Sequence, residues 1–531
     1  MASSIARFAA TPELLMCLAD QWKQIHNRKT LLSLSQTSRL FNTVFAVFLY
    51  KELTLKVPNT GKFYTLLTPS NLEHVRSLIT HPVELYSGGV ESGKRNSLLQ
   101  LLLPHLPQLT TLRWEGLNLT ADTVRMIHRH CPQLESLHVK YTGKEIGRFK
   151  MPSRPFNGFN HWAWSDSSSN HIQEHHPVFH NPGFESFTGL KELCLYGLFG
   201  DLESWCHKIV AIAVSCPQLE TLGLSHSCDT QKLTGYYDTM EPVGFFDDIC
   251  SQYGETGAAP LRLKTLHIGD GGLLRGGIEI MNKLTDVAFL EELGAYDDSE
   301  AWCNDQTVEA FTKTKLPRLR RLIMKWMPLE LITHLKSDRA EDFSQQLALL
   351  ALDFPQGALG GVNPAKLRMT SVMLLPSPAV PDDMASRLGE LADRCGDVLE
   401  GIAFYVGNSP CPARVTKLVL DNLVEVATRL VKLTQIYICF PDGRDQKYSP
   451  SDTYLEFDSA YCADLACRLV RAAPRLRYLC IRGVFWEAQK SVDGTVKLIE
   501  LERQDWRHVE LFKMATEGEG LVWDDRDIQK Y

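Results

Sequence analysis

The chain has 531 residues, of which 44% are apolar and 22% are charged, and its formal net charge at pH 7 is −7. This composition is typical of an ordinary globular protein that can bury a large core. The acidic balance argues against a nucleic-acid backbone as the main partner. We find no run of 18 apolar residues and therefore expect no membrane span. The 14 cysteines include no CxxC pair, which favours free thiols in a reducing compartment, cytoplasmic or nuclear.

Residues 8–56 are expected to form a small domain of three short helices. Pro12 suits the first position of a helix with Thr11 as its N-cap, and Thr30 is the candidate cap of the second helix. The run SRLFNTVFAVFLY begins the third helix, and residues 51–56 alternate as a strand would. So short a segment buries too little apolar surface to be secure alone, so its helices must pack on something.

This N-terminal segment resembles an F-box, particularly those of filamentous fungi. The resemblance rests on PELL (12–15), LLSLS (31–35) and TSRLF (37–41), although Thr11 replaces the usual Leu before the Pro. In that family the helices dock on the Skp-type adaptor of a cullin-RING ubiquitin ligase. The resemblance implies that Phe41 and Phe45 hold the third helix in place. It also implies adaptor contacts by six residues: Pro12, Leu14, Leu15, Leu31, Leu32 and Ser35.

The stretch GGVESGKRNS (88–97) nearly matches a phosphate-binding loop. Gly88, Gly93 and Lys94 have the right spacing, but Arg95 stands where a hydroxyl should reach magnesium. A strand-like VELY (83–86) precedes the stretch and a helix-like NSLLQLLLPHL follows it. We therefore expect a polar turn whose Asn96 or Ser97 caps the following helix, within a linking segment over residues 57–108.

One phrase recurs along residues 109–514. CPQLESLHV (131–139) and CPQLETLGL (216–224) share a frame that reduces to L-x-x-L-x-(apolar), and thirteen segments fit it at a mean spacing of about 33 residues. Helical patterns separate the phrases. The weakest matches are LEELGA (290–295), MTSVML (369–374) and WRHVEL (506–511). A strand and a helix per repeat cannot bury their apolar faces alone, so stacked neighbours must share one core.

This arrangement resembles the long, irregular, helix-containing form of leucine-rich repeats, although the usual Asn or Cys after the second strand Leu is mostly absent. The resemblance implies an α/β fold, a curved solenoid with parallel strands inside and helices outside. An ordinary α/β domain with many Leu-rich strands is the alternative. Residues 515–531 would form a C-terminal tail.

Two other segments were weighed as sites. The insertion 142–186 carries five histidines, and His171 and His175 are spaced as metal ligands on a helix would be, but its Pro and Ser content favours a loop. Gly269 and Gly271 begin a dinucleotide fingerprint, but Leu274 stands where the third Gly should be. We therefore expect no metal and no cofactor, and no catalytic residue can be singled out.

The combined resemblance implies a non-enzymatic subunit of an SCF-type ubiquitin ligase. Its F-box would hold the Skp-type adaptor and through it a cullin, and its repeats would hold a target protein that the sequence does not identify. The alternatives are a repeat scaffold whose N-terminal helices only cap the array, and an enzyme that uses the loop at Gly88. Exposed strand residues are the candidates for target contact: Trp114, His138, Lys140, His267, Lys325 and Trp326.

Overall fold

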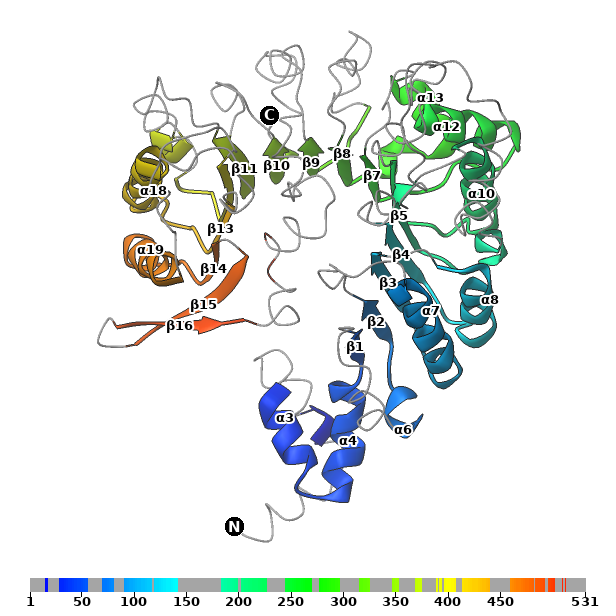
Figure 1. Cartoon of the computed structure of the whole chain (residues 1–531). Helices are drawn as coiled ribbons and strands as arrows, with labels where there is room; N and C mark the ends of the chain where they lie inside the picture. The colour runs from blue at the N-terminus through cyan, green and yellow to red at the C-terminus, as the bar shows by residue number, and fades with distance from the viewer. Residues whose placement is uncertain are drawn as a thin grey trace, which may run out of the picture. The chain divides into compact units, whose positions relative to one another are not determined.

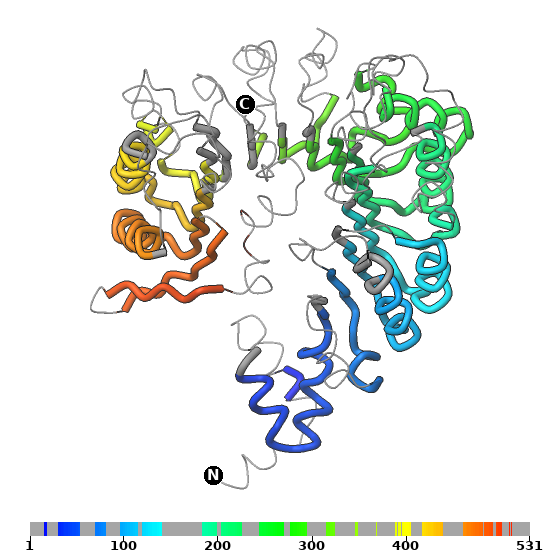
Figure 2. The backbone as a smooth tube through the Cα atoms, viewed as in Figure 1, coloured from blue at the N-terminus to red at the C-terminus, as the bar shows by residue number. Residues whose placement is uncertain are grey.

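The fold is described from a computed structural model of the chain (Figures 1 and 2). It describes residues 15–17, 28–55, 69–80, 90–116, 119–141, 183–198, 202–226, 244–269, 277–296, 315–324, 346–352, 368–374, 388–389, 391–393, 396–406, 413–439, 459–481, 483–491, 495–501, 509 and 511. The chain divides into two compact units, Met1–Arg262 and Leu263–Tyr531. Each unit is described by itself.

Unit 1 contains six parallel strands, each hydrogen-bonded to the next in chain order. The strands are β1 (Glu52–Leu55), β2 (Ser77–Thr80), β3 (Thr111–Gly116), β4 (Ser136–Tyr141), β5 (Glu192–Leu198) and β6 (Thr221–His226). The helices are α3 (Arg28–Ser35), α4 (Arg39–Leu49), α6 (Pro69–Leu72), α7 (Val90–Leu102), α8 (Ala121–His130), α10 (Leu202–Ser215) and α12 (Phe245–Glu255), with 3-10 turns η1 (Leu103–His105) and η3 (Phe184–Ser186).

Unit 2 begins with eight parallel strands, again in chain order, and ends with two antiparallel ones. The strands are β7 (Thr265–Gly269), β8 (Glu292–Tyr296), β9 (Arg321–Met324), β10 (Leu349–Leu352), β11 (Met369–Leu374), β12 (Gly401–Val406), β13 (Gln435–Cys439), β14 (Tyr478–Ile481), β15 (Val484–Lys490) and β16 (Val496–Glu500). The helices are α13 (Gly277–Leu284), α18 (Ala413–Ala427) and α19 (Ser459–Ala472), with a 3-10 turn η4 (Val287–Phe289).

The expected α/β class and the parallel strands are thus confirmed. The strand leucines form the core: Leu112, Leu137 and Leu193 are neighbours on β3, β4 and β5, and all three are fully buried. Burial of each Leu side chain contributes about 1.5–3 kcal/mol. In Figure 1 the helices lie on one side of the strands in each unit. Because strand side chains alternate, the residues next to these leucines, such as Arg113 and His138, point to the opposite side, which we call the open face.

A carbonyl fork repeats along the strands and explains their parallel stacking. In most phrases the residue after the first Leu offers its carbonyl oxygen to two successive N–H groups of the next strand. Thr110 accepts from Glu135 and Ser136 in this way, both at 2.9 Å. Lys51 does the same for Arg76 and Ser77, at 2.9 and 3.0 Å. The ladder therefore begins at β1 and β2, earlier than the expected start at residue 109, and β2 lies in the segment expected to be a link.

Two of the weak phrases differ from expectation. Arg368 accepts the forked bonds from Glu400 and Gly401 at 2.7 and 3.0 Å, so it holds the place that follows a first Leu. The L-x-x-L frame around MTSVML therefore starts at residue 367, two residues earlier than predicted. The prediction was wrong because the register of a strand depends on its pairing with neighbouring strands. WRHVEL was expected to be a strand, but Leu511 is helical and Val509 lies outside any strand.

Helix caps follow the sequence in part. Thr120 caps α8, with its Oγ1 accepting from the Thr123 N–H at 3.3 Å. Ser38 caps α4, with its Oγ accepting from the Phe41 N–H at 3.1 Å. The predicted cap Thr30 instead lies within α3, which already includes Arg28. Within the described ranges, no helix is both long enough and apolar enough to cross a bilayer.

Candidate functional site

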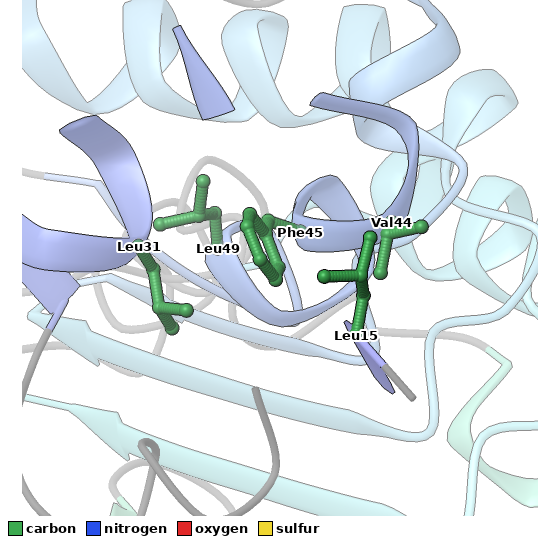
Figure 3. Close-up of a cluster of buried hydrophobic side chains, with 5 residues drawn as sticks. All are labelled: Leu15, Leu31, Val44, Phe45 and Leu49. Carbon is green, nitrogen blue, oxygen red and sulfur yellow. The ribbon is translucent and has the colours of Figure 1, made fainter. Parts of the chain in front are cut away.

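The N-terminal helices have a core of their own. Five side chains from residue 15, α3 and α4 form a cluster, drawn in Figure 3, and each is at most 6% exposed: Leu15, Leu31, Val44, Phe45 and Leu49. Phe41 packs against this cluster, with its ring centroid 5.5 Å from that of Phe45. The prediction that Phe41 and Phe45 hold the third helix is confirmed. The helices thus bury apolar surface without needing a partner.

The structure places the predicted adaptor contacts in different surroundings. Leu15 and Leu31 are 2% and 4% exposed, so their side chains lie in the core of the N-terminal helices. Ser35 is buried as well, and its Oγ donates to the carbonyl oxygen of Leu32 at 2.7 Å. The physical reason is that a segment of this size needs these apolar positions for its own core. Leu32 remains a surface residue, and Pro12 and Leu14 lie outside the described residues.

The exposed apolar side chains of this region are Met16, Leu32 and Leu40, at 46%, 47% and 37% exposure. Met16 and Leu32 each follow a buried leucine. Successive helical residues point about 100° apart, so an inward Leu31 turns Leu32 outward. Sequence reasoning missed Met16 and Leu40. The signal in the sequence was two adjacent apolar residues in a helix, because only one of the two can point into the core.

A polar cluster occupies the open face of unit 1. The Ser136 hydroxyl donates to Glu192 Oε2 at 2.6 Å, and His138 Nε2 lies 3.2 Å from the same oxygen. The hydrogen bond from His138 is the main cause that lowers the pKa of Glu192 to about 2. Burial alone would lower the pKa of His138, but interactions with Cys194 and then Glu192 outweigh it and raise that pKa to about 9. The pair is therefore charged at neutral pH.

A similar pair lies on the open face of unit 2. His267 Nε2 is 2.8 Å from Glu292 Oε1, and Arg321 Nε is 2.9 Å from Glu292 Oε2. In both units the histidine is two residues beyond the position that pairs with the glutamate on the next strand. Strand register therefore brings the two side chains together diagonally. Both open faces therefore carry a His–Glu pair that joins neighbouring strands.

The cluster in unit 1 includes two candidate nucleophiles, Ser136 and Cys194. The Ser136 hydroxyl donates to a carboxylate, so its hydrogen bond does not run to an imidazole that could remove the proton. Cys194 is only 2% exposed, which keeps substrates from its sulfur atom. What the arrangement offers chemically is a set of charged and hydrogen-bonding groups, held by neighbouring strands.

The expected target-contact residues are only partly exposed. Trp114 was expected on the surface but is 1% exposed, because it alternates onto the same side as Leu112. The side chains of His138 and His267 are 23% and 15% exposed, and Lys140 is half-buried. Lys325 and Trp326 lie outside the described residues.

The near-match to a phosphate loop is not a loop. Helix α7 begins at Val90, so Gly93 and Lys94 are helical, whereas a phosphate loop needs the preceding backbone to curve around the ligand. The expected polar turn was also wrong, because Asn96 is a buried residue within the helix. Its Oδ1 accepts from the Thr120 N–H at 3.1 Å and from the Thr123 hydroxyl at 2.8 Å.

Most residues of the two remaining candidate sites lie outside the described residues. This holds for His171 and His175 of the insertion and for Gly271 and Leu274 of the glycine cluster. Gly269 is the last residue of strand β7. Within the ranges that the structure describes, no three His, Cys, Asp or Glu side chains come together as a metal site would require. Nine of the cysteines in those ranges are free thiols, and seven of these nine are buried.

Comparison with known proteins adds no assignment to this geometry. No model of a known protein family matches the chain, and no curated protein matches it either. The functional argument therefore rests on the residues and contacts described above.

Proposed function

We propose that this chain is the substrate-recognition subunit of an SCF-type ubiquitin ligase. Its N-terminal helices bind a Skp-type adaptor, and its strand ladder binds a target protein. The observation that carries the proposal is the order of the parts: a helical segment with its own core, built around Leu31 and Phe45, is followed at once by a ladder of in-frame parallel strands.

The proposal assigns no bond chemistry to this chain. Its contribution is proximity, because holding a target beside a ubiquitin-loaded enzyme on another subunit makes their reaction effectively intramolecular. The adaptor surface would include Leu32 and Met16, since these apolar side chains remain exposed while their neighbours are buried. Apolar side chains that are exposed in the free chain can be buried when a partner binds.

Affinity capture with a purified Skp-type adaptor tests the proposal. The wild-type chain should be retained, and Leu32→Asp should reduce retention at least tenfold, because it places a charge in an apolar interface. Leu31→Asp is unsuitable as a probe, since Leu31 is in the core and the change would unfold the helices.

Leu418→Asp is the matched control. Leu418 is also an exposed helical leucine, at 43%, but it lies on α18 in unit 2, and its substitution should leave capture unchanged. If the wild-type chain fails to bind the adaptor, or if Leu32→Asp binds as well as wild type, the ligase function is refuted. The first of these results would favour a repeat scaffold whose helices only cap the ladder.

A further inference from the structure

A short C-terminal segment lies against the strand ladder of unit 2. The backbone N–H of Leu511 donates to the side-chain oxygen Oε1 of Gln435 at 2.8 Å, across 76 positions of the chain. Gln435 alternates with the fully buried Ile436 and so points to the open face of β13. Leu511 is therefore on the open face.

The segment is well buried there. The side chains of Val509 and Leu511 are 1% and 0% exposed, although neither residue belongs to a strand of the ladder. Leu511 is helical, and its hydrogen bond to the ladder uses a side chain of β13 instead of the strand's backbone. A contact of this type can be released without breaking strand pairing.

The open face beneath is apolar at this point. Ala403, Tyr437 and Cys480 are direct neighbours on β12, β13 and β14, and they are 0%, 6% and 0% exposed. The equivalent face in unit 1 carries the charged His138 and Lys140 instead. These three side chains form an apolar stripe and are buried although they lie on the face opposite the helices, so other side chains of the protein cover them.

We propose that the open face of β12–β14 is a binding surface for a short apolar peptide segment, and that Val509–Leu511 occupies it as an internal ligand. The partner it fits is a target protein that presents a Val-x-Leu-like segment with a free backbone N–H for Gln435. This inference rests on the proposed function, because it names the class of target. A target segment must displace the internal one, which competes at the millimolar effective concentration typical of a tethered ligand.

Peptide binding to the full-length chain tests the inference. The probe is a fluorescein-labelled peptide with the sequence of residues 505–515, DWRHVELFKMA. The Val509→Asp/Leu511→Asp variant should bind it at least tenfold more tightly than wild type, because the charged segment no longer covers the apolar stripe. Adding Gln435→Ala to that variant should weaken binding several-fold, since the acceptor for the Leu511 N–H is lost.

Two controls make the outcome decisive. A peptide with Asp at both positions should not bind. If the folded double variant fails to bind the labelled peptide, or binds it no better than wild type, the inference is overturned. Should the variant not fold, hydrogen exchange on the wild-type chain replaces it: excess peptide should remove the protection of residues 509–511, and unchanged protection overturns the inference.

Adaptor capture of the same preparations separates this inference from the proposed function. Normal capture without peptide binding would refute only the peptide surface. Peptide binding without capture would refute only the ligase function, and the surface would then belong to a scaffold.

Discussion

Asn96→Ala is predicted to destabilise unit 1 although it removes only a small polar side chain from a segment that reads as a turn. Asn96 is 3% exposed, and its Oδ1 joins α7 to the first turn of α8 through Thr120 and Thr123. After substitution, the Thr123 hydroxyl still has Thr120 Oγ1 at 2.8 Å and Gln100 Nε2 at 2.9 Å. The Thr120 N–H, however, loses its acceptor inside the protein.

The cost follows from that lost acceptor. A buried donor left without a partner costs about 1–3 kcal/mol, and because Thr120 is half-buried we expect a loss of about 1 kcal/mol in the free energy of unfolding. For a unit of this size, that corresponds to a fall in melting temperature of about 2–4 °C. Ser97→Ala is the matched control, because Ser97 is exposed, and it should shift the melting temperature by less than about 1 °C.

Scanning calorimetry gives the melting temperature of the unit, and hydrogen exchange locates the loss. The amides at the start of α8 should lose protection in Asn96→Ala and keep it in Ser97→Ala. Equal melting of the two variants would refute the reasoning. It would place Asn96 in an exposed turn and reopen the phosphate-loop interpretation of this segment.

Two further predictions concern titrating groups. His138→Gln should destabilise unit 1 most between about pH 4.5 and 6.5, because in this window Glu192 is ionised and His138 is protonated in the folded and in the unfolded chain. In urea unfolding, the difference in stability between variant and wild type should fade as the pH rises through 9 and as it falls toward 2. Equal loss at pH 10 would contradict this pairing. Burial raises the pKa of Cys131 to about 12 and also raises that of Cys216, so iodoacetamide at pH 8 should label the exposed Cys17 and spare both, as read by mass spectrometry. Rapid labelling of Cys131 in the folded chain would contradict its burial.

The local sequence determined the strands and many of the helix boundaries. The L-x-x-L frame fixes which residues enter the core, because a strand alternates its faces and the leucines at residues 112, 137 and 193 share one side. Caps such as Thr120 act within one turn, so they too can be read directly. The order of helical segment and strand ladder follows from the same local patterns.

Only the tertiary structure decided which leucines of the N-terminal helices are buried. Leu31 and Leu32 are identical adjacent residues, so the sequence does not show which of them is buried. Their exposed fractions of 4% and 47% depend on where α4 packs. It likewise decided that Asn96 is buried, because its partners on α8 lie 24 and 27 residues away. A polar residue in the run GKRNS is interpreted as part of a turn unless that distant helix is known.

The C-terminal segment shows the same limit. WRHVEL fits the strand frame by composition, yet its Leu511 meets Gln435, 76 residues earlier, on the open face of the ladder. The hydrophobic pattern predicts that Leu511 is buried, and the structure confirms this. Which surface buries it depends on contacts between distant parts of the chain, and such contacts leave no periodic signal in the sequence.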